Sequence, residues 1–96
     1  DSTKIVEIIL AFDKVKEVIV TGKLSETDTT KIVAYLQIKE EMDDEDIKRI
    51  KGNISKFMGR EFVPSKFYII DEFPRNINGK IDRKKLLMKS DYKKVF

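Results

Sequence analysis

The chain has 96 residues, of which 41% are hydrophobic and 39% charged, and its formal net charge is +3. This size and composition are typical of one globular domain with a modest core, and no apolar run approaches the roughly 20 residues of a membrane span, which argues against a membrane partner. The absence of cysteine and histidine excludes disulfides, serine–histidine catalysis and most zinc chemistry, so we predict no metal site and a cytoplasmic protein.

The first part of the chain predicts a helix followed by two strands. Apolar residues recur at helical spacing over residues 3–12, with Ser2 or Thr3 as the N-cap. Residues 15–23 and 31–38 are rich in β-branched side chains and are predicted as strands separated by a polar turn. The short connection makes the two strands antiparallel neighbours, and the apolar second strand is expected at the centre of a sheet.

The second part predicts a longer helix, a third strand and a short basic helix. The acidic run EEMDDED at residues 40–46 precedes an apolar helical face within residues 43–58, so we interpret it as helix capping rather than as a metal site. Gly59 suits the end of this helix. A strand over residues 67–73 and a helix near 83–90 complete an α+β fold, in which about three helices flank a small sheet made of an antiparallel β-hairpin plus a third strand.

Positive charge is concentrated at the C-terminal end. Residues 74–96 contain 8 Lys/Arg and 2 Asp/Glu, whereas residues 1–73 contain 12 and 15. A basic end suggests an anionic partner, either nucleic acid or a phosphorylated small molecule. A solvated, lysine-rich terminal helix is the alternative interpretation of the charge alone.

The stretch PRNINGKIDRKKLL at residues 74–87 holds one lysine between a turn and a helix. Asn78-Gly79 is the preferred pair for a tight turn with positive φ at both central residues. Asp82 is predicted as the N-cap of the following helix. Lys80 is thus fixed on both sides, and its ammonium can reach a phosphate or carboxylate as a point charge. The alternative is a hairpin that merely exposes a lysine.

Residues 62–87, FVPSKFYIIDEFPRNINGKIDRKKLL, resemble the C-terminal end of the adenylate-forming enzymes. That superfamily includes nonribosomal peptide synthetase adenylation domains, D-alanine–carrier-protein ligases, and acyl-CoA and aryl-CoA synthetases. Its pattern is a Val-Pro step, a strand, Leu-Pro, a short loop and Asn-Gly-Lys-Val-Asp-Arg, which matches here at residues 63–64, 73–74 and 78–83. The stretch VKEVIV at residues 15–20 resembles the first strand of the same subdomain, so the resemblance covers essentially the whole chain.

The match has one departure inside the loop. Members of the superfamily often carry Thr-Pro before Asn-Gly-Lys, whereas this chain carries Asn76-Ile77. The resemblance therefore does not say which residue of this chain, if any, makes the loop contacts of that threonine.

The resemblance implies that residues 1–96 are a single domain, the mobile C-terminal lid cut from a larger ATP-dependent ligase, whose N-terminal adenylation core domain is absent. Lys80 would be the adenylation lysine, and Asn78, Gly79 and Lys80 would lie at the nucleotide. The intact enzyme would use ATP and Mg²⁺ to form an acyl-adenylate, then pass the acyl group to the phosphopantetheine of a carrier protein or to coenzyme A. The fragment alone would bind no cofactor and be inactive.

Two hypotheses from other classes remain. A nucleic-acid-binding module would stack bases on Tyr68, Tyr92 and Phe96 beside the C-terminal lysines, although the aromatics of the third strand alternate as core residues do. A docking module without catalysis would bind an acidic carrier protein through the basic helix.

Overall fold

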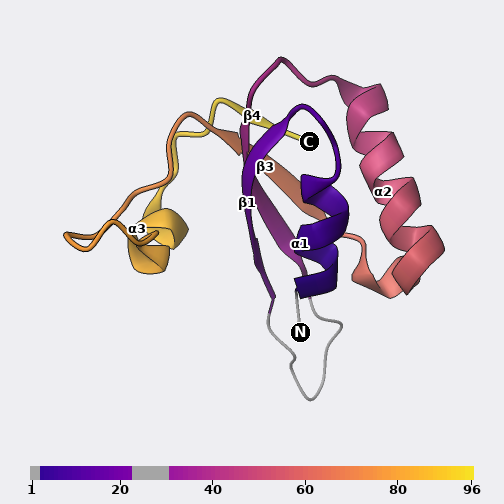
Figure 1. Ribbon diagram of the computed structural model, residues 1–96, viewed down its shortest axis with the longest axis horizontal. Helices are drawn as coiled ribbons and strands as arrows, with labels where there is room; N and C mark the ends of the chain where they lie inside the picture. Colours follow the sequence, from indigo (N-terminus) through magenta and orange to yellow (C-terminus); the bar gives the residue numbers. More distant parts are fainter. Residues whose placement is uncertain (1–2, 23–30) are drawn as a thin grey trace.

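The computed structural model describes residues 3–22 and 31–96, which form a mixed α+β domain (Figure 1). This confirms the predicted fold class. In chain order the elements are α1 (Thr3–Leu10), β1 (Val15–Thr21), β2 (Val33–Ile38), α2 (Asp44–Met58), a 3-10 turn η1 (Arg60–Phe62), β3 (Lys66–Ile70), α3 (Arg83–Met88) and β4 (Lys94–Val95). None of the helices in these two ranges is long and apolar enough to cross a bilayer.

The strands form one sheet in the order β1-β2-β3-β4. β1 and β2 pair antiparallel, with Val20 opposite Ala34, as the short connection predicts. β2 and β3 pair parallel, because the chain crosses over through α2 and η1 before it re-enters the sheet. β2 therefore has a strand on each side, which confirms its predicted central position.

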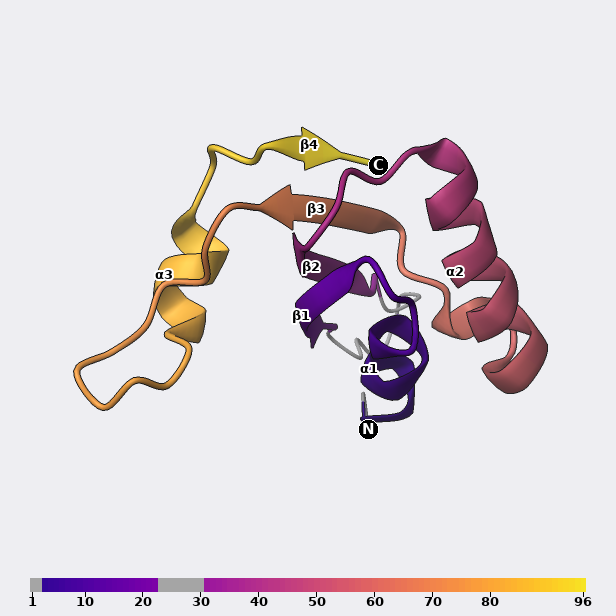
Figure 2. The ribbon, with the colours of Figure 1, turned by 45° about the horizontal axis from the view of Figure 1, so that its top comes forward.

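Two apolar clusters cover the two faces of the sheet. Successive side chains of a strand point to opposite faces of the sheet. Ala34 and Phe67 therefore lie on the face covered by α1 and α2, whereas Tyr35 and Ile70 lie on the opposite face. Leu86 of α3 is fully buried in this second cluster. Figures 1 and 2 accordingly show α3 and the loop before it well apart from α1 and α2.

Several predicted boundaries are wrong. The first helix ends at Leu10 instead of residue 12, because Phe12 already lies in the turn into β1. The third strand ends at Ile70 instead of residue 73, because Phe73 leaves the sheet and packs in the second cluster. The last helix ends at Met88 instead of residue 90.

The N-cap and one strand also differ from the sequence analysis. Thr3 is the first residue of α1 rather than its cap, and Ser2 lies outside the described residues. The short strand β4 was not predicted. Its end is held by two backbone hydrogen bonds between Phe96 and Phe67, of 2.8 and 3.1 Å.

The acidic run before α2 caps the helix, as predicted. Asp43 is the N-cap, and its side chain accepts a hydrogen bond from the N–H of Asp46, while the Asp46 carboxylate accepts one from the N–H of Asp43. Asp46 is buried, and its carboxylate also accepts a 2.9 Å hydrogen bond from the Lys14 ammonium. This ion pair joins the start of α2 to the turn before β1.

We expect the Lys14–Asp46 pair to make stability depend on pH. Hydrogen bonds from the Lys14 ammonium and the Asp43 backbone hold the pKa of Asp46 below its ordinary value. A depressed carboxyl pKa stabilises the fold above the unfolded value of about 4, and this contribution is lost as the pH falls through the folded pKa. The hydrogen bond to Asp46 likewise raises the pKa of Lys14, so its contribution is lost only as the pH rises through that raised value.

Urea unfolding of wild type and Asp46→Asn across the acidic range measures this effect. The urea midpoint of the variant should be lower near pH 7, and the difference should shrink as wild-type Asp46 becomes protonated, below about pH 4. Asp44→Asn is the matched control, because Asp44 lies in the same helical turn and makes neither contact. A wild-type advantage that is as large in acid as at neutral pH would contradict this account.

Candidate functional site

The segment between β3 and α3 folds into a small hairpin that ends in a turn. An isolated bridge pairs Arg75 with Ile81. The N–H of Asn76 donates to the carbonyl of Lys80 at 2.8 Å, and the N–H of Gly79 donates to the carbonyl of Asn76 at 2.9 Å. The backbone on both sides of Lys80 is therefore fixed by hydrogen bonds.

The side chain of Asn76 organises this turn. Its Oδ1 accepts hydrogen bonds from the N–H of Asn78 at 2.9 Å and from the N–H of Lys80 at 3.1 Å. The first of these is the bond of an Asx turn, which Asn makes readily with the residue two positions on. In the sequence Asn76 was only a departure from the superfamily pattern, and its spacing to Asn78 is the signal that would have shown this role.

The predicted turn geometry is wrong in one respect. Positive φ was expected at both Asn78 and Gly79, but among the described residues only glycines have positive φ, and Gly79 has φ 83°. The hydrogen bond from Gly79 to Asn76 makes Gly79 the fourth residue of the turn rather than its third. No neighbouring atom would obstruct a Cβ at Gly79, so its conformation alone favours glycine there.

Lys80 lies between this turn and a capped helix, as predicted. The Asp82 carboxylate accepts a hydrogen bond from the N–H of Lys85 at 3.1 Å, which makes it the N-cap of α3. Leu86 anchors that helix in the second cluster, and Ile81 packs against the same cluster. Lys80 itself is exposed, and within residues 3–22 and 31–96 its ammonium has no hydrogen bond or ion pair.

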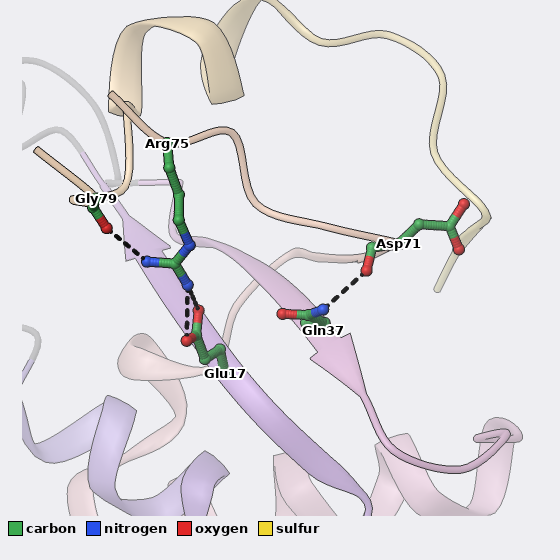
Figure 3. Close-up of polar contacts among 5 residues, drawn as sticks. All are labelled: Glu17, Gln37, Asp71, Arg75 and Gly79. Carbon is green, nitrogen blue, oxygen red and sulfur yellow. Dashed lines mark hydrogen bonds and ion pairs between the residues drawn. The ribbon is translucent and has the colours of Figure 1, made fainter. Parts of the chain in front are cut away.

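One arginine joins the turn to the sheet (Figure 3). A terminal nitrogen of Arg75 donates to the carbonyl of Gly79 at 3.0 Å, and the other donates to both carboxylate oxygens of Glu17 in β1 at 2.9 Å. At the root of the segment, Gln37 donates to the carbonyl of Asp71 at 2.9 Å. Arg75 and Glu17 lie 58 positions apart, and no local pattern in the sequence indicates that they pair.

The described residues around Lys80 do not enclose a ligand. Two shallow pockets flank the root of the segment, and Lys80 lines neither of them. Within the described ranges no three acidic, histidine or cysteine side chains come together as a metal site. Among the described residues, Lys80 is thus an unpaired cation on a hydrogen-bonded turn, outside both of these pockets.

The aromatic side chains of the nucleic-acid hypothesis pack against one another. The rings of Tyr68 and Tyr92 stack at 4.2 Å, and that of Tyr35 lies 5.2 Å from Tyr68. Tyr35 is buried, and this burial raises its pKa to about 12. Phe96 packs against the first cluster. Tyr68, Tyr92 and Phe96 are thus partly buried, and their rings pack against the two clusters rather than standing free on the surface.

Comparison with known proteins places this loop in a family. Residues 4–80 match the model of the AMP-binding enzyme C-terminal domain, and the match ends on Lys80. The chain belongs to this family. The resemblance inferred from residues 62–87 is confirmed, and the AMP-binding enzyme C-terminal domain accounts for most of the chain.

Its relatives are much longer proteins. The chain is 32% identical over 79 residues to D-alanine–D-alanyl carrier protein ligase of Lactococcus lactis subsp. lactis (strain IL1403), covering 77% of this chain and 16% of that protein. It is 31% identical over 78 residues to bacitracin synthase 2 of Bacillus licheniformis, covering 81% of this chain and 3% of that protein. A solved structure of o-succinylbenzoate CoA synthetase from Bacillus subtilis shares the fold, with a TM-score of 0.73 and 19% identity over 97% of this chain and 18% of that one.

Proposed function

We propose that this AMP-binding enzyme C-terminal domain is the lid of an ATP-dependent ligase that activates a carboxylic or amino acid as its adenylate. The observation that carries the proposal is Lys80, an exposed cation without a partner among the described residues, held between a hydrogen-bonded turn and a capped helix. In this proposal the chain supplies the lysine, and a larger N-terminal core domain supplies the pockets for the acid and ATP.

The charges of the reaction explain the need for such a lysine. A carboxylate that attacks the α-phosphate of ATP brings two anions together, and negative charge grows on the phosphoryl oxygens in the transition state. A preorganised ammonium between the two reactants offsets both effects, and Mg²⁺ on the nucleotide would neutralise further phosphate charge. The carboxylate is already ionised at neutral pH, so the reaction needs no general base and is compatible with a chain that lacks histidine.

The residues around Lys80 suit contact with a nucleotide. Lys80 would reach the substrate carboxylate and the phosphate, and Asn78 and Gly79 would form the turn at the same surface. Because the described residues hold no metal-binding cluster, the proposal assigns Mg²⁺ to the nucleotide and the core domain.

The names of the relatives support a thiol acceptor. One relative is named as a ligase of a carrier protein, and the structural neighbour as a CoA synthetase. We therefore propose that the acyl group passes to carrier-protein phosphopantetheine or to coenzyme A, within the cytoplasm.

The proposal predicts that the 96-residue chain alone is inactive. The purified 96-residue chain should catalyse no ATP–pyrophosphate exchange with any acid in a panel of amino and carboxylic acids, because these residues do not include the core domain. The full-length protein should catalyse exchange with at least one of those acids. Strong exchange by the purified chain, or none by the full-length protein with any acid, would contradict the proposed function.

A further inference from the structure

We infer that Arg75 and Glu17 are positioning residues for Lys80, and that their ion pair sets the direction in which the lysine is presented. This inference rests on the proposed function of Lys80. It concerns a contact between two segments far apart in the chain, the turn and the strand β1 (Figure 3).

The internal hydrogen bonds of the turn fix its shape but not its direction. Asn76 closes the turn through its side chain, and the bridge between Arg75 and Ile81 closes its base. All these contacts lie within the loop, so they would be preserved if the whole turn swung relative to the sheet. Ile81 packs against the second cluster and anchors the base of the hairpin on one side. A contact to the sheet on the other side, at Arg75, would set the orientation of the tip.

The Arg75 guanidinium provides that contact. One terminal nitrogen donates to the carbonyl of Gly79, the residue directly before Lys80, and the other donates to both oxygens of Glu17. Among the described residues this is the only polar contact between residues 74–80 and the strands of the sheet. The planar, forked guanidinium suits two partners at once, whereas a lysine ammonium is a single point charge.

The exposure of the pair indicates a role in positioning more than in stability. The side chains of Arg75 and Glu17 are 44% and 36% exposed. Ion pairs this open contribute little to folding and are weakened by salt. A small displacement of a catalytic group, in contrast, lowers the rate strongly even when the fold is intact.

The test uses the full-length protein and ATP–pyrophosphate exchange with its best acid. Glu17→Gln removes the charge of the acceptor, and Arg75→Lys keeps the cation but loses the fork. Each should lower kcat for exchange by about tenfold, leave the KM for ATP nearly unchanged and leave the urea midpoint nearly unchanged. Glu72→Gln is the matched control, because Glu72 is an exposed carboxylate of the same segment without a partner among the described residues, and it should behave as wild type.

Two further measurements separate positioning from a general structural role. The double variant Arg75→Ala/Glu17→Ala should be no slower than Arg75→Ala alone, because both substitutions break the same contact. Raising the ionic strength should narrow the gap in kcat between wild type and Glu17→Gln, since salt screens the wild-type pair only.

The outcomes distinguish this inference from the proposed function. If Lys80→Ala abolishes exchange while Glu17→Gln and Arg75→Lys match wild type, the positioning role is wrong and the proposed function stands. If Lys80→Ala has no effect on exchange, the proposed function is wrong, and the positioning role that rests on it is wrong as well. Equal loss of kcat in Glu72→Gln, or a large drop in the urea midpoint of Glu17→Gln, would also overturn the positioning role.

Discussion

Replacing Lys80 with alanine should slow adenylation by the full-length protein by about 10²–10³-fold, the loss expected when one preorganised charged contact to a transition state is removed. The substitution removes the cation whose backbone is held between the turn and the capped start of α3. The measurement is ATP–pyrophosphate exchange at saturating acid and ATP, where the loss should lie in kcat.

The control for Lys80→Ala is Lys84→Ala. Lys84 is an exposed lysine of α3 that also has no partner among the described residues, but it is not held by the turn. Lys84→Ala should change the exchange rate only slightly, and neither variant should shift the urea midpoint, because exposed lysines contribute little to folding. Similar losses of exchange in both variants would show that the general charge of the basic end matters, and not the placement of Lys80.

Replacing Phe67 with alanine should destabilise the 96-residue chain by about 3–5 kcal/mol, as is usual for truncating a buried phenylalanine. Phe67 is 0% exposed, at the centre of the sheet in the cluster under α1 and α2. Because the stability of a whole domain is commonly about 5–15 kcal/mol, this loss would remove a large part of it.

Urea unfolding followed by circular dichroism measures the effect, with Phe57→Ala as the control. Phe57 lies on α2 with 66% exposure, so the same truncation there should cost less than about 1 kcal/mol. If the Phe67→Ala chain is already unfolded without urea, its spectrum shows the predicted loss directly. Equal midpoints for the two variants would contradict the described core.

The parts of the fold that local patterns determine could be predicted from the sequence. The acidic cap of α2 and its apolar face follow from the spacing and position of side chains within about two helical turns. The cap is present and Ile47, Ile50 and Ile54 are buried, whereas Phe57, which the same spacing assigns to this face, is exposed. The β1–β2 hairpin follows from two β-branched runs with a short connection. The Asp82 cap beside Lys80 is equally local.

The parts of the fold that were predicted wrongly depend on contacts between distant residues or are very short segments. β4 has only two residues, Lys94 and Val95, and it exists because β3 offers a free edge. The end of β3 depends on where Phe73 finds space in the second cluster, which no local pattern shows.

The site shows the same division. The motif around Lys80 is continuous in the sequence and could be found there. The match of residues 4–80 to the AMP-binding enzyme C-terminal domain confirms the family. The Arg75–Glu17 pair, in contrast, requires knowing that β1 runs beside the loop. The turn geometry at Gly79 was predicted wrongly although it is local: the side chain of Asn76 shifts the turn by one residue, and the spacing of Asn76 to Asn78 was its signal in the sequence.

The most direct test of the proposed lid is acyl transfer from a supplied acyl-adenylate. In the proposal, the loop carries Lys80 to the reactants for adenylation and moves away for thioester formation, as mobile lids do in multistep enzymes. Single-turnover transfer from the purified adenylate to the thiol acceptor should therefore proceed at nearly the wild-type rate in full-length Lys80→Ala, although this variant is deficient in pyrophosphate exchange. Equal damage to both half-reactions would mean that Lys80 supports the structure of the site as a whole, and it would contradict the proposed lid.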